Sequence, residues 1–375
     1  MNGFDVCVRG RGAVGQALAL SLARLGLRVA LAAAGVPPAG PDVRTYALGA
    51  PSIALLGQLK VWDALRAARP SAATRVTAMQ VAGDHGGALE FSAWQQHVQE
   101  LAWIVDAAAL ERELAAALRF SPHVTLVDRA VPAALTAWCD GRHGAAAATL
   151  GVPVEQHDYG QRAIAARLAC ERPHQGIARQ WFRAPDILAL LPFDLEGGVA
   201  GAGYGLVWSL PESRAADLLA LDEAAFEAAL QAATGGAVGR LSLASPRAAW
   251  PLKLARATRW HGPGWVLLGD AAHVVHPLAG QGLNLGLADV ATLTEVLAAR
   301  QRDEPWRPLD DDKLLARYAR QRAMPTWAMG QVTDGLLQLF AHDHPALREL
   351  RNRGLSLVDH LPPLKRWLAG RAMQA

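Results

Sequence analysis

The apolar positions near the N-terminus predict a strand, a turn, a helix and a second strand in close succession. An apolar strand begins near Val6, and a second one is expected from Val29 to Leu31. In the glycine-rich turn, the first glycine permits a tight bend, the second lets the backbone approach a pyrophosphate, and the third lets the helix pack closely on the strand. This βαβ context predicts a dinucleotide site at Gly10, Gly12, Ala13, Val14 and Gly15.

A second stretch, from Trp265 to Val290, also combines an apolar strand with a glycine-rich turn and a helix. Its strand covers 266–268, so Asp270 falls at the carboxyl end, where open α/β sheets bind ligands. The run from Gly280 to Asn284 then opens a helix whose free N–H groups favour negative charge. A flavin ring that becomes anionic on reduction is a group that such a turn would hold. The alternative interpretation is a strand-to-helix turn capped by the aspartate.

The middle of the chain predicts a mixture of strands and helices. β-rich runs at 76–83 and 204–210 are typical of strands, and the segments 222–234 and 311–340 carry helical spacing. The glycine-rich stretch from Gly197 to Gly205 predicts a hairpin turn rather than a second nucleotide site. No internal repeat is visible.

Composition favours a two-domain enzyme and excludes several other classes. The 375 residues are 51% hydrophobic and 19% charged, which argues against disorder. The net charge of +3 is too small to indicate nucleic-acid binding. Three widely spaced cysteines indicate neither a disulfide framework nor a metal site and favour a reducing compartment. Because we find no signal peptide or uninterrupted membrane-spanning run, we expect a cytoplasmic protein, with surface association at the inner membrane left open.

These motifs and several more specific ones resemble the flavin-dependent hydroxylases of ubiquinone biosynthesis. That family lies within the single-component FAD monooxygenases similar to para-hydroxybenzoate hydroxylase. The resemblance is spread over nearly the whole chain. Its further segments are DVRTYAL at 42–48, LAWIVDAAAL at 101–110, CDGRHG at 139–144, HDYGQRAI at 157–164, ERPHQGIARQWF at 171–182 and RNRGLSLVDHLPPLK at 351–365.

The resemblance implies an α/β fold with a Rossmann-like FAD-binding domain of the glutathione-reductase type. A β-sheet substrate domain would be interleaved with it, and helices would follow at the C-terminus. The FAD-binding domain is expected at 1–70, 101–150 and 254–305, and the substrate domain at 71–100 and 151–253. The region 306–375 would then form the C-terminal helical part.

The resemblance also implies the chemistry. NADH or NADPH would reduce FAD, O2 would add to form a flavin hydroperoxide, and one oxygen would pass to an electron-rich aromatic ring. The expected substrate is a polyprenylated phenol on the route to ubiquinone. Two alternatives stay open. One is a hydroxylase of a soluble aromatic compound, and the other is a flavin-poor, non-catalytic member of a quinone-synthesis complex.

On the matched positions, the resemblance assigns roles to residues at both ends of the chain. The N-terminal glycines would bind the pyrophosphate, and Arg44 would lie near the flavin or its phosphates. Asp270 would bond the ribityl chain, and Pro277 would border the ring on the substrate side. Asp140 resembles a residue that contacts FAD and NAD(P)H, although Asp-Gly is also an ordinary turn. The backbone of the flavin turn would contact the pyrimidine edge through Gly280, Gly282, Leu283 and Asn284.

Side-chain catalysts are less clearly indicated, because the flavin carries the difficult chemistry. His276 and His174 are weak candidates for moving a phenol proton, and packing or capping roles are at least as good an interpretation. The tryptophans admit two interpretations as well. The residues concerned are Trp103, Trp181 and Trp208. In one interpretation they line an apolar pocket for a prenyl tail, and in the other they fill the core.

Two departures from the family pattern bear on cofactor affinity. Ala33 occupies the place where dinucleotide folds carry an acidic ribose ligand. The segment before Asp140 is also short, where relatives usually carry additional strands. Either adenosine is anchored weakly, or the chain has lost most of its FAD binding. Near the C-terminus, basic residues at Lys365, Arg366 and Arg371 form a solvated face or a docking site for a membrane or complex.

Overall fold

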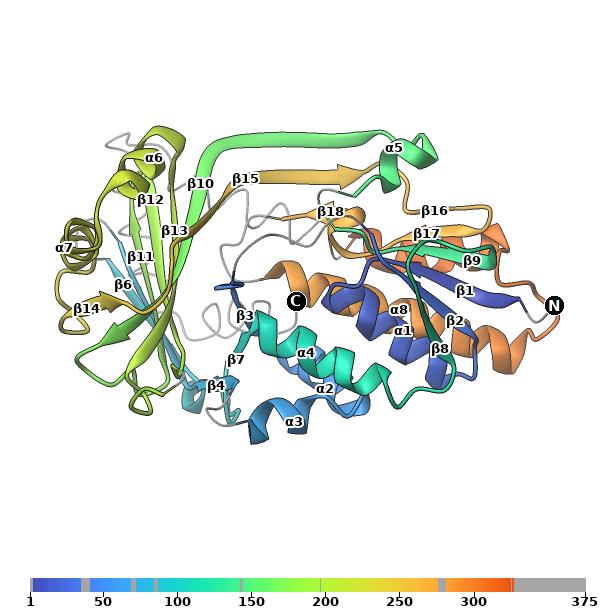
Figure 1. The fold of residues 1–375 in the computed structure, drawn as a ribbon, viewed down its shortest axis with the longest axis horizontal. Coiled ribbons are helices and arrows are strands. Elements are labelled where there is room, and N and C mark those ends of the chain that lie inside the picture. Colours follow the sequence, from blue (N-terminus) through green and yellow to red (C-terminus); the bar gives the residue numbers. More distant parts are fainter. Residues whose placement is uncertain are drawn as a thin grey trace.

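Three β-sheets organise the chain in the computed structural model (Figure 1). The structure describes residues 3–34, 41–68, 72–83, 87–141, 144–195, 197–275, 281–324 and 326. A six-stranded sheet lies in one half of the molecule and a nine-stranded sheet in the other. A three-stranded sheet sits between them.

The six-stranded sheet is the nucleotide-binding type that the N-terminal pattern predicts. Its order is β16-β17-β9-β1-β2-β8, and all neighbours except β16 and β17 run parallel. Buried apolar runs form its inner strands, as parallel sheets covered by helices require. Its strands are β1 (Phe4–Arg9), β2 (Val29–Ala32), β8 (Val124–Val127), β9 (Ala133–Trp138), β16 (His261–Gly262) and β17 (Trp265–Leu267).

Three long helices cover this sheet. Helix α1 (Ala13–Arg24) follows β1 and packs against both α4 (Ala107–Leu118) and α8 (Gln281–Asp303). Most of α1 is buried, because it lies between the sheet and these helices. By length and composition α8 is apolar enough to span a membrane, but 56% of its most apolar window is buried within the protein. Helix α8 is therefore a core helix here.

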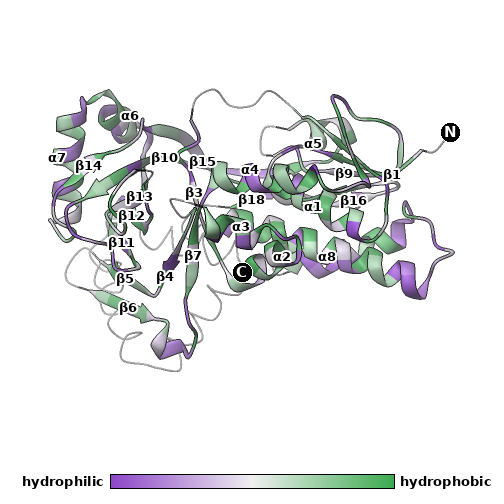
Figure 2. Cartoon of the chain, turned by 60° about the horizontal axis from the view of Figure 1, so that its bottom comes forward, coloured by the Kyte–Doolittle hydropathy of each residue, from purple (hydrophilic) through white to green (hydrophobic). Residues whose placement is uncertain are grey.

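The nine-stranded sheet is largely antiparallel and forms the other half. Helices α6 (Glu212–Ala220) and α7 (Glu223–Thr234) cover its outer face (Figure 1). Figure 2 shows polar and apolar residues on both helices, as expected when one face packs on a sheet and the other faces water. The strands are β5 (Ala78–Ala82), β6 (Ala88–Ser92), β10 (Val154–Cys170), β11 (Ile177–Arg183), β12 (Asp186–Pro192), β13 (Gly203–Pro211), β14 (Leu241–Leu243), β15 (Ala248–Ala257) and β18 (His273–Val274).

The two long strands β10 and β15 connect the halves. They pair with each other from one end of the nine-stranded sheet to the region of α5 (Ala146–Leu150), beside the nucleotide-binding half (Figure 1). The register shifts between Asp158 and Gln161, which marks a bulge. The short strand β18, which follows the corner at Asp270, joins the edge of this sheet by pairing with β15.

The three-stranded sheet and its helices lie between the halves. Its order is β3-β7-β4, with antiparallel pairing throughout. Asp106 caps α4 by accepting a hydrogen bond from the Ala109 N–H at 2.9 Å, and it pairs with Arg167 of β10 at 2.7 Å. The elements are β3 (Thr45–Leu48), β4 (Ala73–Val76), β7 (Ala102–Asp106), α2 (Ala50–Gln58) and α3 (Trp62–Ala67). Two short helices lie elsewhere: η1 (Trp94–Gln96) follows β6, and η2 (Gly269–Ala271) forms the corner between β17 and β18.

The predicted elements that fall within the described residues are found where the pattern placed them, and most of the predicted helical segment beyond 324 lies outside those residues. The stretch from Gly197 to Gly205 joins the antiparallel strands β12 and β13, as a hairpin turn does. Strand β8 leads to β9 without another strand in the described chain, which agrees with the short segment noted in the sequence. Residues 312–324 are helical. Lys365, Arg366 and Arg371 lie outside the described residues.

We propose that the two halves correspond to the cofactor and substrate domains expected from the sequence. The six-stranded sheet draws its strands from the segments 1–70, 101–150 and 254–305. The nine-stranded sheet draws most of its strands from 71–100 and 151–253, while β15 and β18 extend past the later boundary. Strand β4 lies in the three-stranded sheet, so the boundary near residue 71 falls within that sheet.

Candidate functional site

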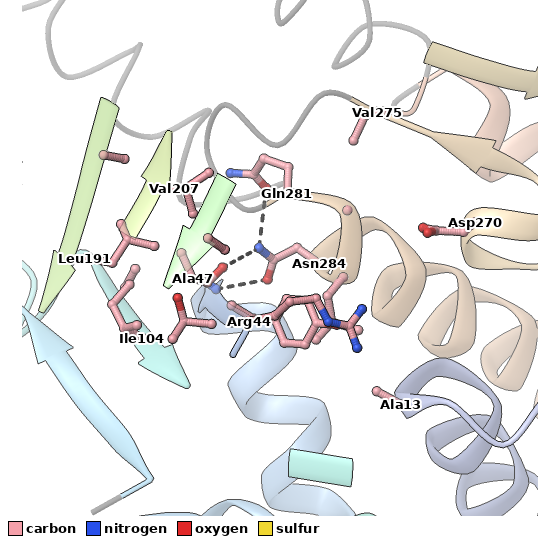
Figure 3. A pocket seen from close by; sticks show the side chains of 18 of the residues that line it. Ala13, Arg44, Ala47, Ile104, Leu191, Val207, Asp270, Val275, Gln281 and Asn284 are labelled. Carbon is pink, nitrogen blue, oxygen red and sulfur yellow. Dashed lines mark hydrogen bonds between the residues drawn. The ribbon is translucent and has the colours of Figure 1, made fainter. Parts of the chain in front are cut away.

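A cavity of about 400 Å³ lies between the halves. Strands of the nine-stranded and three-stranded sheets line it, together with turns and helix starts that follow strands of the six-stranded sheet. Figure 3 shows Ile104, Leu191 and Val207 on one side of it, with Ala13 and Asp270 opposite. The first group comes from the middle and nine-stranded sheets, and the second from the nucleotide-binding half. The cavity therefore has one side built from helix starts and turns, and another built from an apolar sheet face.

The turn between β1 and α1 is shaped by its glycines. A Cβ atom on Gly10 would lie 2.2 Å from the Cys139 carbonyl oxygen, and Gly10 has φ +116°. A Cβ on Gly15 would lie 1.9 Å from the Gly10 carbonyl oxygen. Only glycine fits these two positions, because backbone atoms cannot move aside as a flexible side chain can. The turn consequently packs directly against the end of β9.

The start of α1 is open toward the cavity. Gly12 occupies the N-cap position and has no side chain to cap the helix, and the Ala13 N–H is directed at the Glu111 carboxyl of α4. Gly12, Ala13 and Val14 all line the cavity. A helix start of this kind, aimed into a cavity, suits a phosphate group.

The corner after β17 packs against the same helix start. Gly269 has φ +59°, and a Cβ there would lie 3.3 Å from the side chain of Val14. A Cβ on Gly286 of α8 would lie 2.7 Å from Val14. Three elements distant in sequence thus meet with almost no space between them. This close packing holds Asp270 in the cavity wall, opposite the sheet.

A buried ion cluster fixes this corner from behind. Asp289 of α8 is fully buried and accepts hydrogen bonds from the Gly269 N–H at 2.9 Å and from Arg322 Nε at 2.7 Å. Its Oδ2 also lies 2.7 Å from His273 Nε2. Burial raises the pKa of Asp289, but His273 and Arg322 outweigh it and hold that pKa below its usual value. Asp289 therefore stays ionised.

The start of α8 is anchored by Asn284. Its Oδ1 accepts hydrogen bonds from the Gly49 N–H at 3.1 Å and from the Ser52 hydroxyl at 2.7 Å. Its Nδ2 donates to the Ala47 carbonyl at 2.7 Å (Figure 3). Gly282, Leu283 and Asn284 line the cavity, as the sequence predicts. Because the Asn284 side chain is used inside the protein, Asn284 itself can meet a ligand only through its backbone.

Arg44 lines the cavity and forms a two-point ion pair with Asp42. Its Nε lies 2.8 Å from Asp42 Oδ1, and its Nη2 lies 2.7 Å from Oδ2. This hydrogen bonding raises the pKa of Arg44 further above its already high value. The guanidinium is thereby fixed beside the helix starts with its plane set by the carboxylate.

The sheet side of the cavity is lined mostly by small and apolar side chains, with the polar residues Arg179, Gln180 and Lys253 among them. Gln180, Ala189, Val207 and Ala165 are cross-strand neighbours on β11, β12, β13 and β10, and they form one row across the sheet. All four line the cavity. Larger apolar side chains complete this side at Val76, Met79, Phe91, Leu101, Ile104 and Leu191. Such a wall suits an apolar ligand and excludes water from it.

Some residues singled out by the sequence lie elsewhere. Asp140 ends β9, and its Oδ2 accepts a hydrogen bond from the Ala146 N–H at 3.2 Å, so the side chain is turned to α5 rather than the cavity. His174 is buried beside Tyr204, and its Nδ1 accepts a hydrogen bond from the Gly176 N–H at 3.0 Å. Neither side chain lines the cavity, and their proposed roles stay predictions. His276, Pro277 and Gly280 lie outside the described residues.

The three tryptophans are buried and lie away from this cavity. Trp103 packs edge-on against Trp62 with ring centroids 5.2 Å apart, and Trp208 is almost fully buried under α7. Trp181 belongs to the same buried cluster as Trp208, and the register of β11 and β13 points these two to the face covered by helices. Trp181 and Trp208 also line a second cavity on that face, so their role at a prenyl tail stays a prediction.

Sequence reasoning missed many residues of the cavity, and two of them stand out by their chemistry. Glu111 of α4 and Trp250 of β15 both line it. Glu111 stands five residues after Asp106, the cap of α4, in a helix that directly follows a buried strand. The sequence around Asp106 predicts a helix that starts where a strand ends. It does not show that this helix, α4, packs beside α1, and that packing is what brings Glu111 to the cavity.

Comparison with known proteins identifies the family. A domain family described as an FAD binding domain matches residues 113–333. The ubiquinone hydroxylase UbiL of Rhodospirillum rubrum is 31% identical over an alignment that covers 98% of this chain and 89% of that protein. The chain belongs to the ubiquinone-biosynthesis family of FAD-dependent hydroxylases. Another relative in this family, the 3-demethoxyubiquinol 3-hydroxylase of Escherichia coli, is 31% identical with 96% of each chain covered.

Solved structures show that this hydroxylase shares the fold of FAD-dependent monooxygenases. The p-nitrophenol 4-monooxygenase PnpA from Pseudomonas putida DLL-E4 has a TM-score of 0.79 at 16% identity, covering 100% of this chain and 99% of that one. PqsL from P. aeruginosa, solved with 2-aminobenzoylacetate, has a TM-score of 0.77 at 19% identity, covering 94% and 99%. These similarities confirm the predicted α/β fold with a Rossmann-like FAD-binding domain.

Proposed function

We propose that this protein hydroxylates the aromatic ring of a polyprenylated phenol in ubiquinone synthesis, using FAD, NAD(P)H and O2. The observation that carries the proposal is the two-sided cavity. The starts of α1 and α8 and an aspartate face it on one side, and a row of small apolar side chains faces it on the other. A flavin requires the first kind of wall, and a substrate with a long hydrocarbon tail requires the second. Family membership supports the same assignment.

The residues of the nucleotide side suit FAD. We assign the diphosphate to the start of α1 at Gly12 and Ala13, where the glycine turn leaves room for backbone to approach it. We assign the ribityl hydroxyls to Asp270 and the pyrimidine edge to the backbone N–H groups of Gly282 and Leu283. When bound, FAD supplies the reduction by NAD(P)H and the activation of O2 that no amino-acid side chain provides.

The residues of the sheet side would hold and shield the substrate. The apolar row at Ala165, Ala189 and Val207 removes hydrocarbon from water, and each buried CH2 contributes about 0.8 kcal/mol to binding. Exclusion of water also protects reactive oxygen chemistry from side reactions. Docking of the protein on the inner membrane or in a quinone-synthesis complex stays a prediction, because the basic residues Lys365 and Arg366 lie outside the described residues.

The test combines a spectrum with a rate. The purified protein is expected to be yellow or to take up added FAD, and polyprenylated phenol is expected to stimulate NAD(P)H oxidation with formation of hydroxylated product. Simple phenols without a tail serve as the control and should stimulate it much less. A protein that takes up no FAD would contradict the proposal in favour of a non-catalytic role. Equal stimulation by simple phenols would contradict the prenylated substrate and favour a soluble one.

A further inference from the structure

Glu111 faces the start of α1, at the place assigned to the diphosphate. It lines the cavity with Gly12 and Ala13, although it comes from a different helix. A Cβ atom added to Gly12 would lie 4.0 Å from Glu111 Oε1, and the backbone N–H of Ala13 is directed at the Glu111 carboxyl. The Glu111 carboxyl and the expected diphosphate would therefore both accept a hydrogen bond from the same donor, the Ala13 N–H.

The charge around this position is unfavourable for an anion. Arg44 is the cation that lines this part of the cavity, and its two-point pair with Asp42 balances its charge. An ionised Glu111 would then leave one carboxylate facing a bound diphosphate. Two anions cannot share the Ala13 N–H, and their mutual repulsion grows in a cavity that excludes water. A protonated carboxyl behaves differently, because it carries an O–H that can donate to a phosphate oxygen.

We propose that Glu111 binds the diphosphate of FAD in its protonated form, so that FAD binding takes up one proton. The carboxyl then contributes a hydrogen bond instead of a repulsive charge. This inference rests on the proposed function, since it needs FAD at the start of α1. It assigns a cofactor-binding role to a residue outside both glycine motifs, and it makes cofactor affinity depend on pH.

The other titratable groups around Glu111 are poorer candidates for taking up this proton. The segment before β3 contributes Asp42 and Arg44, and β3 contributes Tyr46. Burial raises the pKa of Asp42, but the hydrogen bonds from Arg44 outweigh it and keep Asp42 ionised. Burial raises the pKa of Tyr46 to about 12, so the phenol stays neutral. Helix α1 presents backbone N–H groups, and η2 presents Asp270 to the same cavity.

Burial also favours the protonated form of Glu111 itself. It raises the pKa of Glu111, and Asp42 adds to that direction, while Arg44 and the Ala13 N–H oppose it; the net shift is upward. A bound diphosphate would raise the pKa again by adding negative charge. Because FAD binding takes up a proton, FAD affinity is greatest at low pH. It falls as pH rises through the pKa of free Glu111, by up to about tenfold per pH unit.

The experiment is a titration of the flavin-free protein with FAD between pH 5 and 8.5, followed by flavin fluorescence. The wild-type Kd should rise with pH, and calorimetry in two buffers of different ionisation enthalpy should count close to one proton taken up. Glu111→Gln keeps the shape and a donor but cannot ionise. It should bind FAD with little pH dependence and, at pH 8, about tenfold more tightly than wild type.

Two further variants complete the design. Glu113→Gln on the same helix does not touch the cavity and should keep the wild-type profile. Asp270→Asn distinguishes the contribution of the second carboxyl in the cavity from that of Glu111. It should weaken FAD binding while keeping the dependence of Kd on pH. A wild-type profile without pH dependence, or a slope retained in Glu111→Gln, would overturn the inference while the FAD assignment stands. Weaker binding by Glu111→Gln would also overturn it, because the ionised carboxylate would then be the form that favours FAD. Absence of FAD binding by the wild type at every pH would instead refute the proposed function.

Discussion

The two sides of the cavity are built by different means. The nucleotide side relies on backbone, since glycine turns and helix starts at Gly10, Gly12 and Gly282 leave room and N–H groups for a ligand. The sheet side relies on side-chain size, since a row of small residues across three strands creates the space. A backbone site tolerates little change at a few positions. A side-chain site can be reshaped at many positions without loss of the fold.

The difference predicts that the two sides can be disabled separately. Changes on the nucleotide side should remove FAD, and a bound substrate could then not be hydroxylated. Changes on the sheet side should leave FAD in place and alter only which ring compounds are bound. The following predictions test this separation, from the largest expected effect to the smallest.

The largest effect is expected for Gly15→Ala. The added Cβ would lie 1.9 Å from the Gly10 carbonyl oxygen, so the turn that receives the diphosphate must move. Overpacking of this kind costs about 1–3 kcal/mol of folding free energy and more where only backbone can yield. We expect loss of FAD binding and a lower melting temperature. Gly26→Ala tests glycine loss elsewhere, because its Cβ would meet nothing within 4 Å, although its φ of +78° adds strain. Retention of FAD by Gly15→Ala would show that the diphosphate lies elsewhere.

The ion cluster behind the corner should give the next largest effect. Arg322→Met leaves Asp289 buried without its arginine, and breaking a buried pair costs about 3–5 kcal/mol. Chemical denaturation of the flavin-free protein measures that cost. An FAD titration measures whether the Kd rises because the Gly269–Asp270 corner has moved.

The double variant Asp289→Asn with Arg322→Met provides the control for this cluster. Because it removes both charges, it should recover much of the lost stability. If the single variant is as stable as wild type, Arg322 does not hold the corner. If the double variant is no better than the single one, the cost lies in packing rather than in charge.

Asp270→Ala should act on the cofactor without unfolding the protein. Loss of a hydrogen bond to a charged acceptor costs about 1.5–3 kcal/mol, which is about 10–100-fold in Kd. We therefore expect the variant to emerge from purification without flavin, as measured by its visible absorption. Because Ala33 stands where dinucleotide folds carry an acidic ribose ligand, we expect this corner to carry a larger share of the affinity. Full flavin occupancy in Asp270→Ala would place the anchoring at the other end of the chain.

On the sheet side, Ala189→Phe should block the substrate and spare the cofactor. The larger side chain fills the middle of the apolar row, so the KM for a polyprenylated phenol should rise about tenfold or more. FAD content should equal that of wild type. Ala189→Ser, which is almost the same size, serves as the matched control and should change KM little. Loss of FAD in Ala189→Phe would show that the two sides are not separable.

The smallest effect concerns the outer face of the same sheet. Burial raises the pKa of Asp186 to about 6, against the opposing effect of Arg214. A folded-state pKa above the unfolded one means that this group's stability is present at low pH and is lost as pH rises toward 6. The loss is at most about 3 kcal/mol for a two-unit shift. Asp186→Asn should flatten the dependence of unfolding free energy on pH between 4 and 6. An unchanged slope would assign that dependence to other groups.

The sequence predicted most of the nucleotide side, because its signals are local. The glycine spacing at the N-terminus and the Gly269-Asp270 corner each follow an apolar strand, and the structure brings both to one cavity. The same local reading could not find Glu111 or the partnership of Asp289 with Arg322. Those contacts depend on how α1, α4 and α8 pack together, which no short stretch of sequence specifies.

The sheet side was poorly predicted for a related reason. The large aromatic residues drew attention as pocket-lining candidates, yet the space is formed by Ala165, Ala189 and Val207. Which face of a strand carries the cavity depends on register, and a shift by one residue exchanges the two faces. Trp208 and Val207 are adjacent in sequence and point to opposite sides of the sheet. Only the paired strands reveal which of them meets the ligand.

The central claim is that one cavity holds FAD against the helix starts and an apolar-tailed phenol against the sheet. Its most direct test is the visible difference spectrum of the FAD-loaded protein during titration with a polyprenylated phenol. We predict a saturable change in the flavin bands for the wild type, because the ring would bind beside the flavin, and a much weaker response in Ala189→Phe at equal FAD content. No spectral change, or the same change at the same concentration in both proteins, would contradict the account.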